Sequence, residues 1–440
     1  MVLIIVCAII LLYGLIQYMK GRKGQGAFVF FFFLTGGFHF LSQSWCPVKY
    51  PDVAVVYLMA VAMLNAVKGN NKFFKPQIKI YKVAAIIGLY ITLEFVRTLV
   101  RQEEFFSFAL ANYRTYIPLF SFWLAQELKE QEVNRLLKQI AVITVISTVL
   151  FDLQPILNLK ILQHANIGET RFRNIPYLAY FFMFLATIRL GFSRWKTVSL
   201  IFVYLIAIVL TLHRAVLISY AFCIGVYLFL SRKGSKLLQY GLVGLVIFLF
   251  VGDAIINRFE GETKERSTLE DIKTVMNLDY KSAAYYENEN VNGTFSFRVL
   301  LLMERVDYML EKSQYPVFGI GTRHEDSPKT KQEFNFILGT INHNTELIGQ
   351  ISSGDLAWVN PLMRFGFFGI ALFLYLSWTI IRFLYKKRKI SDVTMTAFLF
   401  YLFLILISFK NDHLYGNMQL FFVYLLIEYI RDSNRKNKII

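Results

Sequence analysis

The feature that most constrains this chain is a succession of long apolar runs separated by short polar connections. An α-helix needs about 20 apolar residues to cross the ~30 Å hydrocarbon core of a membrane, and most of the runs approach that length. Hydrophobic residues make up 56% of the 440 residues and charged residues only 18%. A water-soluble protein of this size would have too few charged residues to cover so much apolar surface. The sequence therefore predicts an all-α polytopic membrane protein with about 13 (12–14) transmembrane helices. The predicted spans are 2–19, 27–43, 52–67, 83–100, 107–124, 139–152, 175–190, 197–212, 215–230, 237–255, 357–382, 392–408 and 416–430.

The placement of charge orients these helices. If connection 20–26 is cytoplasmic, every second short connection is cytoplasmic too, and together with the tail 431–440 these carry 26 Lys and Arg. The short connections on the other side carry 7. Lysine and arginine accumulate on the cytoplasmic side, so the C-terminus is predicted to be cytoplasmic. The net charge of +17 then reflects topology and contact with anionic membrane lipids, and it does not indicate nucleic-acid binding.

The same topology divides the chain into three regions. Residues 1–255 hold transmembrane helices 1–10, residues 256–356 form one large extracytoplasmic loop, and residues 357–440 hold helices 11–13 and a cytoplasmic tail. Connections as long as this loop are usually functional or disordered. Within it, residues 298–311 have their apolar side chains at the spacing of an amphipathic helix.

Arginine is frequent on the predicted outer side, where the charge rule gives no reason for it. The guanidinium group presents a planar fork of donors that matches phosphate and pyrophosphate, so these arginines suit an anionic, lipid-linked substrate. The candidates are Arg114, Arg171, Arg173, Arg214 and Arg298. The alternatives are an arginine that reaches out to the membrane interface and, for Arg298 and Arg305, the solvated face of a helix. For Arg305, which follows Glu304, we favour the solvated face.

The position of Arg214 depends on how residues 198–230 fold. This nearly continuous apolar run is broken by His213 and Arg214. A single long helix would place two basic connections on opposite sides of the membrane. A hairpin keeps both on the cytoplasmic side and places Arg214 at the outer face, and this is our interpretation.

Two residues of the loop are candidate general bases, His343 and Asp355. The alternatives are a loop histidine with local hydrogen bonds and an acid at the start of a helix. The turn Pro316–Arg323 contains two glycines, which indicates backbone packed closely against a ligand or another helix. The chain has no Asp-x-Asp, no pair of histidines at metal-ligand spacing and no Gly-x-Ser-x-Gly, which argues against a metal site or a serine hydrolase.

The order of these features resembles the O-antigen ligase/polymerase superfamily of bacterial envelope glycosyltransferases. The residues that carry the resemblance are Arg214 at a helix start, Arg298 in the large loop, the Pro316-x-x-Gly319-x-Gly321 turn, and Gly366-x-x-Gly369 leading into an apolar helix. The family has a histidine about eleven residues before the first of these last glycines, where this chain has Asp355. His343-Asn344 looks like the family's dipeptide, but the helix does not follow it at the right distance. We favour Asp355, because the whole downstream pattern fits it.

The resemblance implies an enzyme with a GT-C-like architecture in the bacterial cytoplasmic membrane. It would polymerise repeat units of a glycan carried on polyprenyl pyrophosphate, at the outer face of that membrane. Arg214 and Arg298, together with Arg173, would bind the pyrophosphate, and Asp355 or His343 would be the base. The donor is already activated, so no cofactor, nucleotide or metal is implied. The partners implied are the lipid-linked donor, a glycan acceptor, membrane lipids and a chain-length regulator protein.

Two other functions stay open at this stage. A ligase would transfer the glycan to a lipid core or a protein, and the aspartate in place of histidine favours a polymerase over it. A flippase for lipid-linked sugars would share the composition of this chain. Such transporters place ionisable residues along a midplane cavity, whereas here the charged candidates gather on one side of the membrane.

Overall fold

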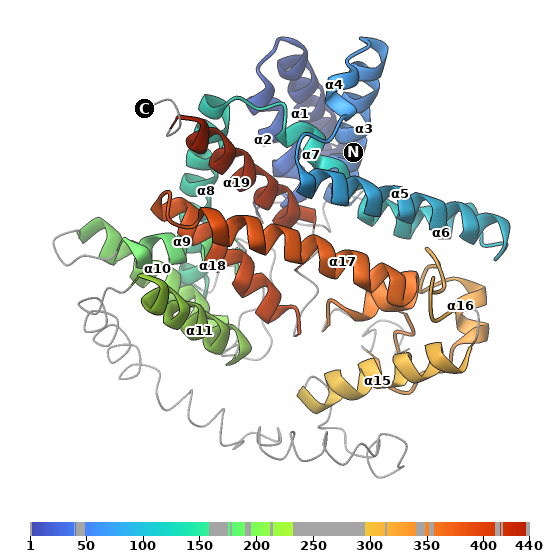
Figure 1. Ribbon diagram of the computed structural model, residues 1–440. Coiled ribbons are helices and arrows are strands. Elements are labelled where there is room, and N and C mark those ends of the chain that lie inside the picture. The colour runs from blue at the N-terminus through green and yellow to red at the C-terminus, as the bar shows by residue number, and fades with distance from the viewer. Residues whose placement is uncertain are drawn as a thin grey trace.

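The computed structural model describes most of the chain. The described residues are 2–38, 40, 49–157, 175–176, 178–189, 195–211, 214–231, 295–312, 315–339, 348–351, 356–409, 414 and 417–436. Their regular secondary structure is helical, as the apolar runs predict. The helices are α1 (Val2–Met19), α2 (Lys23–Leu34), α3 (Tyr50–Val67), α4 (Asn71–Phe74), α5 (Lys79–Val100), α6 (Phe106–Tyr113), the 3₁₀ helix η2 (Arg114–Ser121), α7 (Phe122–Ala125), α8 (Glu130–Leu157), α9 (Ala179–Ile188), α10 (Trp195–Thr211), α11 (Arg214–Ser231), α15 (Phe295–Glu311), α16 (Pro328–Glu333), α17 (Val359–Lys387), α18 (Asp392–Ile407) and α19 (Asn417–Lys436) (Figure 1).

Four of these helices are long and apolar enough to cross a membrane by length and composition: α3, α5, α8 and α17. Six shorter apolar helices accompany them, in α1, α2, α9, α10, α11 and α18. A multi-pass membrane protein is therefore supported, while the total of 13 spans stays a prediction. The predicted span at 237–255 lies outside the described residues.

Two predicted spans have a particular form in the structure. The span predicted at 107–124 consists of three pieces, α6, η2 and α7, and Pro118 lies inside η2. Proline lacks the N–H that a regular helix would use, so a change in helix type at this point is expected. The run 198–230 forms two helices, with α10 ending at Thr211 and α11 beginning at Arg214, as the hairpin interpretation requires.

Some contacts between helix ends join connections that the charge analysis places on the same side, while the topology itself stays a prediction. Within the basic group, Lys23 pairs with Glu127, Arg189 pairs with Asp392 at 3.2 Å, and Gln77 accepts a hydrogen bond from Arg431. At the other end of the helices, the connection after α5 contacts the large loop, and Trp358 donates a hydrogen bond to Ser408. We call this second end the loop end.

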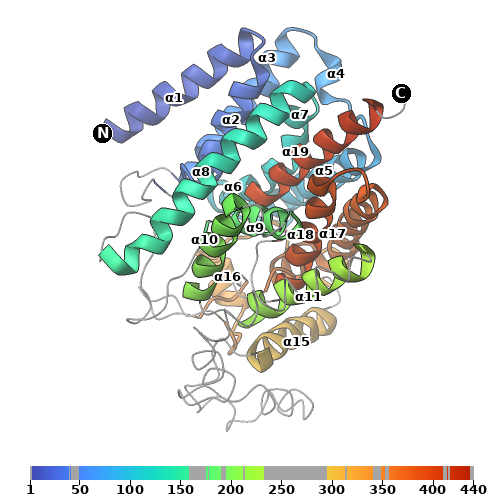
Figure 2. The same ribbon diagram turned by 90° about the vertical axis from the view of Figure 1, so that its left-hand side faces the viewer.

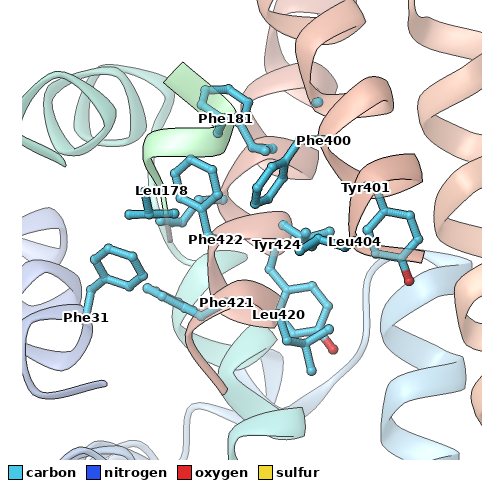
Figure 3. Packing of buried hydrophobic residues seen from close by; sticks show 14 of the residues in the cluster. Phe31, Leu178, Phe181, Phe400, Tyr401, Leu404, Leu420, Phe421, Phe422 and Tyr424 are labelled. Carbon is cyan, nitrogen blue, oxygen red and sulfur yellow. The ribbon is translucent and has the colours of Figure 1, made fainter. Parts of the chain in front are cut away.

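The centre of the molecule is an aromatic core. Phe31 of α2, Phe181 of α9, Phe400 of α18 and Phe422 of α19 are buried where their four helices meet (Figure 3). The ring centroids of Phe181 and Phe422 are 5.0 Å apart and their planes are nearly perpendicular, a favourable edge-to-face arrangement. This core holds α18 and α19 against the N-terminal helices.

The large loop has a separate core of its own at the loop end. The prediction of an amphipathic helix is confirmed by α15, whose Phe297, Leu300 and Met309 are buried against Tyr315, Phe334 and other loop side chains. Val359 and Met363 at the start of α17 complete this core. Figures 1 and 2 both show α15 at the opposite edge of the molecule from α1. The loop therefore folds directly onto the first turns of α17.

Candidate active site

The loop is joined to α17 through a break in that helix. At Gly366, φ is +62° and ψ is −166°, a conformation far from helical. In an uninterrupted helix the amides of Phe367 and Phe368 would bond to the carbonyls of residues 363 and 364, four positions earlier. The break frees all four groups, and buried backbone groups of this kind need partners.

The Pro-x-x-Gly-x-Gly turn provides those partners. The amides of Ile320 and Gly321 donate to the carbonyls of Met363 and Arg364, both at 2.8 Å. In return, the amides of residues 367 and 368 donate to the carbonyls of residues 316 and 317, at 2.8 and 3.1 Å. We call this set of four backbone hydrogen bonds, between residues 316–321 and 363–368, the glycine joint. Of the two expectations for the turn, packing against a ligand or against a helix, the structure shows the second.

The glycines of the joint are required by space as well as by conformation. A Cβ on Gly319 would lie 2.5 Å from the carbonyl carbon of Arg364, and a Cβ on Gly366 would lie 2.4 Å from the carbonyl oxygen of Val317. Gly319 and Gly321 have φ values of +67° and +72°, in the region that glycine adopts most readily. The two glycine motifs of the resemblance are thus halves of one backbone contact.

Helix α5 supports the joint from its other side. Arg97 donates hydrogen bonds to the carbonyls of Phe318 and Gly319, at 3.2 and 2.8 Å, and its Nε donates to Glu94 at 2.7 Å. The Thr98 hydroxyl accepts from the amide of Thr322 at 2.9 Å. The Glu94–Arg97 pair, which the sequence places inside a span, therefore anchors the turn.

A second set of polar contacts fixes the loop to the connection after α5. Arg323 is buried, donates from Nε to Gln102 at 3.0 Å and pairs with Glu333. Burial of Glu333 acts to raise its pKa, but hydrogen bonds from Tyr315 and Arg323 outweigh this effect and hold the pKa of Glu333 below its ordinary value of 4.5. The carboxylate is accordingly charged at neutral pH.

The structure corrects the interpretation of Arg305. The expected solvated side chain is only 1% exposed and packs against the ring of Phe336, with its guanidinium carbon 4.3 Å from the ring centroid. Arg305 pairs with Glu304 and donates to the carbonyl of Gly349 at 3.3 Å, while Glu304 accepts from the amide of Ile337 at 2.9 Å. Burial lowers the pKa of Arg305 to about 10, so the group remains charged at neutral pH. A folded loop has an interior, and the sequence pattern of α15 alone did not reveal it.

Two other polar residues at the loop end are candidates for chemistry that the sequence did not single out. Arg364 precedes the break and is 5% exposed. His324 stacks on Phe108, with ring centroids 5.8 Å apart, and its Nδ1 accepts from the amide of Asp326 at 3.1 Å. Burial, and to a smaller extent the charge of Arg364, lower the pKa of His324, so the ring is neutral at pH 7. An arginine inside an apolar run was the available signal for Arg364.

The predicted pyrophosphate-binding residues differ in what the structure says of them. Arg298 lies in the first turns of α15 and is half-buried. Arg114 begins η2, where it pairs with Asp52 at 2.8 Å and donates to the carbonyl of Ala111 at 3.1 Å, so it links η2 to α3. Arg214 is the first residue of α11, and its side chain is not among the described ones.

The remaining predicted site residues, Arg171, Arg173, His343 and Asp355, lie outside the described residues. Their roles stay predictions. Within the described ranges, no three His, Cys, Asp or Glu side chains come together as a set of metal ligands.

Comparison with known proteins adds an independent observation. No curated protein gives a significant match to the chain. Residues 181–374 match the family model described as O-antigen ligase. The matched region covers less than half of the chain and includes α11, α15 and both halves of the glycine joint. The match supports the resemblance of the chain to the O-antigen ligase/polymerase superfamily.

Proposed function

We propose that the chain is a membrane glycosyltransferase that polymerises oligosaccharide repeat units carried on polyprenyl pyrophosphate, at the outer face of the bacterial cytoplasmic membrane. The observation that carries this proposal is the glycine joint. It connects the Pro-x-x-Gly-x-Gly turn to the helix break at Gly366, and both lie inside the matched residues 181–374. A loop folded on the end of a membrane helix is a suitable platform for chemistry at the membrane surface.

In the proposed reaction, an acceptor sugar hydroxyl attacks the anomeric carbon of the donor. A new C–O bond forms, the bond from that carbon to the pyrophosphate oxygen breaks, and polyprenyl pyrophosphate leaves. Arg214 and Arg298, with Arg173, bind the pyrophosphate and stabilise its developing charge. Asp355, or His343 in the alternative register, takes the proton from the hydroxyl. The donor is activated by its own leaving group, so we include no metal and no nucleotide in this scheme.

The second candidate in the same class is a ligase that transfers the glycan to a lipid or protein. The description of the matching family favours it, whereas the aspartate at the position of the family's histidine supports a polymerase. A flippase for lipid-linked sugars is the candidate from another class. The three functions differ in what accumulates when the protein is inactive.

The test is the length distribution of surface glycan in cells that carry Asp355→Asn, His343→Ala or Arg214→Ala, with membrane levels of each variant confirmed. A polymerase whose base is Asp355 predicts that Asp355→Asn and Arg214→Ala leave single repeat units on the surface and remove longer chains. Loss of long chains in His343→Ala alone would assign the base to the histidine. Loss of all surface glycan, with long lipid-linked chains retained, would identify a ligase. Normal chains in all three variants would refute the proposed mechanism, and lipid-linked units trapped in the cytoplasm would favour a flippase.

A further inference from the structure

A cleft at the loop end is formed by two parts of the chain. One wall consists of the end of α5 and the connection after it, with Arg97, Arg101 and Glu103. The other wall is the loop segment 315–333. The cleft has a volume of about 1220 Å³, larger than the roughly 300–1,000 Å³ typical of pockets for drug-sized ligands. It is open to the surroundings, so a ligand longer than the cleft can extend beyond it.

The charges of the cleft nearly cancel. Its lining contains four cationic side chains and three carboxylates. Three of the cations, Arg97, Arg323 and Lys329, already pair with lining carboxylates, those of Glu94, Glu333 and Glu103. A pyrophosphate would therefore meet carboxylates at short range and little uncompensated positive charge. A polar ligand without net charge fits better.

The remaining donors and acceptors are dense and of both kinds. Guanidinium groups have five N–H donors and a carboxylate can accept about four hydrogen bonds, so each pair keeps unused capacity. Glu103 pairs with Lys329 at 3.7 Å, but its side chain is 85% exposed and keeps room for further hydrogen bonds. Gln332 contributes an amide that both donates and accepts. Phe318 is 46% exposed and adds an aromatic face. Sugar units carry hydroxyls that donate and accept around C–H faces, and this lining matches both features.

The two walls are fixed to each other before any ligand binds. Gln102 accepts at its side chain from Arg323 at 3.0 Å and at its carbonyl from Lys329 at 2.7 Å. Ser327 donates to Glu104 at 2.7 Å. Preorganisation of this kind reduces the entropy cost of binding. The α5 wall lies outside the family-matched residues 181–374, whereas the loop wall lies inside them.

We propose that this cleft binds an uncharged stretch of several sugar units, the glycan part of the substrate. The inference rests on the proposed function and extends it, because it names the residues that select the sugar. The α5 wall, which lies outside the family-matched residues, would then determine which glycan this chain accepts.

The experiment measures binding of a lipid-free, phosphate-free probe to the full-length protein in detergent. The probe is the repeat-unit oligosaccharide released by mild acid from the lipid-linked pool of cells that express this protein. Saturation-transfer NMR titration gives the dissociation constant for the wild type, for Arg101→Ala and for Gln332→Ala. The control is Lys331→Ala, a neighbouring substitution on α16 that does not line the cleft. Equal melting temperatures verify that the variants fold.

We expect the wild type and Lys331→Ala to bind alike and each cleft variant to bind at least tenfold more weakly. Unchanged binding in both cleft variants would overturn the inference. So would displacement of the probe from the wild type by inorganic pyrophosphate or by phosphatidylglycerol vesicles, which would identify an anion site. Chain length in the same cells is measured in parallel. Long surface chains without binding of the probe would refute the cleft alone, and binding without any transfer activity would refute the proposed function alone.

Discussion

Replacement of Gly366 by alanine should weaken the glycine joint. The residue has φ of +62° and ψ of −166°, a region that is essentially restricted to glycine. The added methyl group would lie 2.4 Å from the carbonyl oxygen of Val317 and 2.8 Å from the amide nitrogen of Gly319. The atoms in the way belong to the backbone, so no side chain can rotate to make room.

The magnitude follows from the two ways in which the chain can respond. If the joint is kept, the strained backbone costs about 1–3 kcal/mol, and the contact with Val317 adds to this. If the turn moves away, four backbone hydrogen bonds are lost, at about 0.5–1.5 kcal/mol each. The chain takes the cheaper response, so we expect a loss of about 2–3 kcal/mol in the local stability of the joint. Since 1.4 kcal/mol is a factor of ten, this corresponds to roughly 30- to 150-fold in an opening equilibrium.

Amide hydrogen exchange in detergent measures this opening directly. Peptides that contain the amides of residues 320–321 and 367–368 should lose protection by about that factor in Gly366→Ala. The matched control is Gly225→Ala, because a Cβ on Gly225 of α11 would meet nothing within 4 Å. Protection of the joint in Gly225→Ala should equal that of the wild type. The reasoning is refuted if Gly366→Ala also keeps wild-type protection.

Three further predictions concern the polar contacts around the joint. Arg97→Ala removes two hydrogen bonds to turn carbonyls and leaves the buried Glu94 without its partner. Thermal unfolding in detergent should therefore show a loss of stability on the order of 2 kcal/mol. The double variant with Glu94→Gln should regain part of that stability. Because the pKa of Glu333 is held below 4.5 in the folded loop, its stabilising contribution is complete above that pH and is lost as the pH falls through the folded pKa. Glu333→Gln should therefore melt with less dependence on pH below about 4.5 than the wild type, and equal dependence would contradict the assignment. Arg305→Ala removes one partner of a buried ion pair, which should destabilise the loop by about 3–5 kcal/mol. Protease cleavage within the loop should therefore be faster in this variant. Glu311→Gln, at the exposed end of α15, should leave the cleavage rate unchanged.

The sequence was sufficient for the features that depend on local pattern. Apolar runs of the right length predicted the helices, and the spacing of apolar residues predicted α15. The polar residues His213 and Arg214 predicted that the apolar run 198–230 forms two helices. These features follow from one segment and its solvent, so no knowledge of distant residues was needed.

The sequence could not predict features that depend on pairing between distant segments. The burial of Arg305 arises because residues 336 and 349 fold over it. The partnership of the turn with the break at Gly366 likewise joins two motifs that are about 50 residues apart. A glycine in a sequence indicates close approach, but only the fold reveals to what. The candidate bases His343 and Asp355 lie outside the described residues, and the choice between them stays a prediction.

The glycine joint has a consequence for how such a chain can change over time. Its four hydrogen bonds involve main-chain atoms alone. They therefore require particular residues at Gly319, Gly321 and Gly366, and at few other positions of the two motifs. Neighbouring side chains, such as the exposed Phe318 and Phe367, can be exchanged while the connection between loop and membrane helix persists. A backbone connection of this kind allows the surrounding side chains to change while the loop stays attached to α17. In the sequence it is marked only by a few separated glycines.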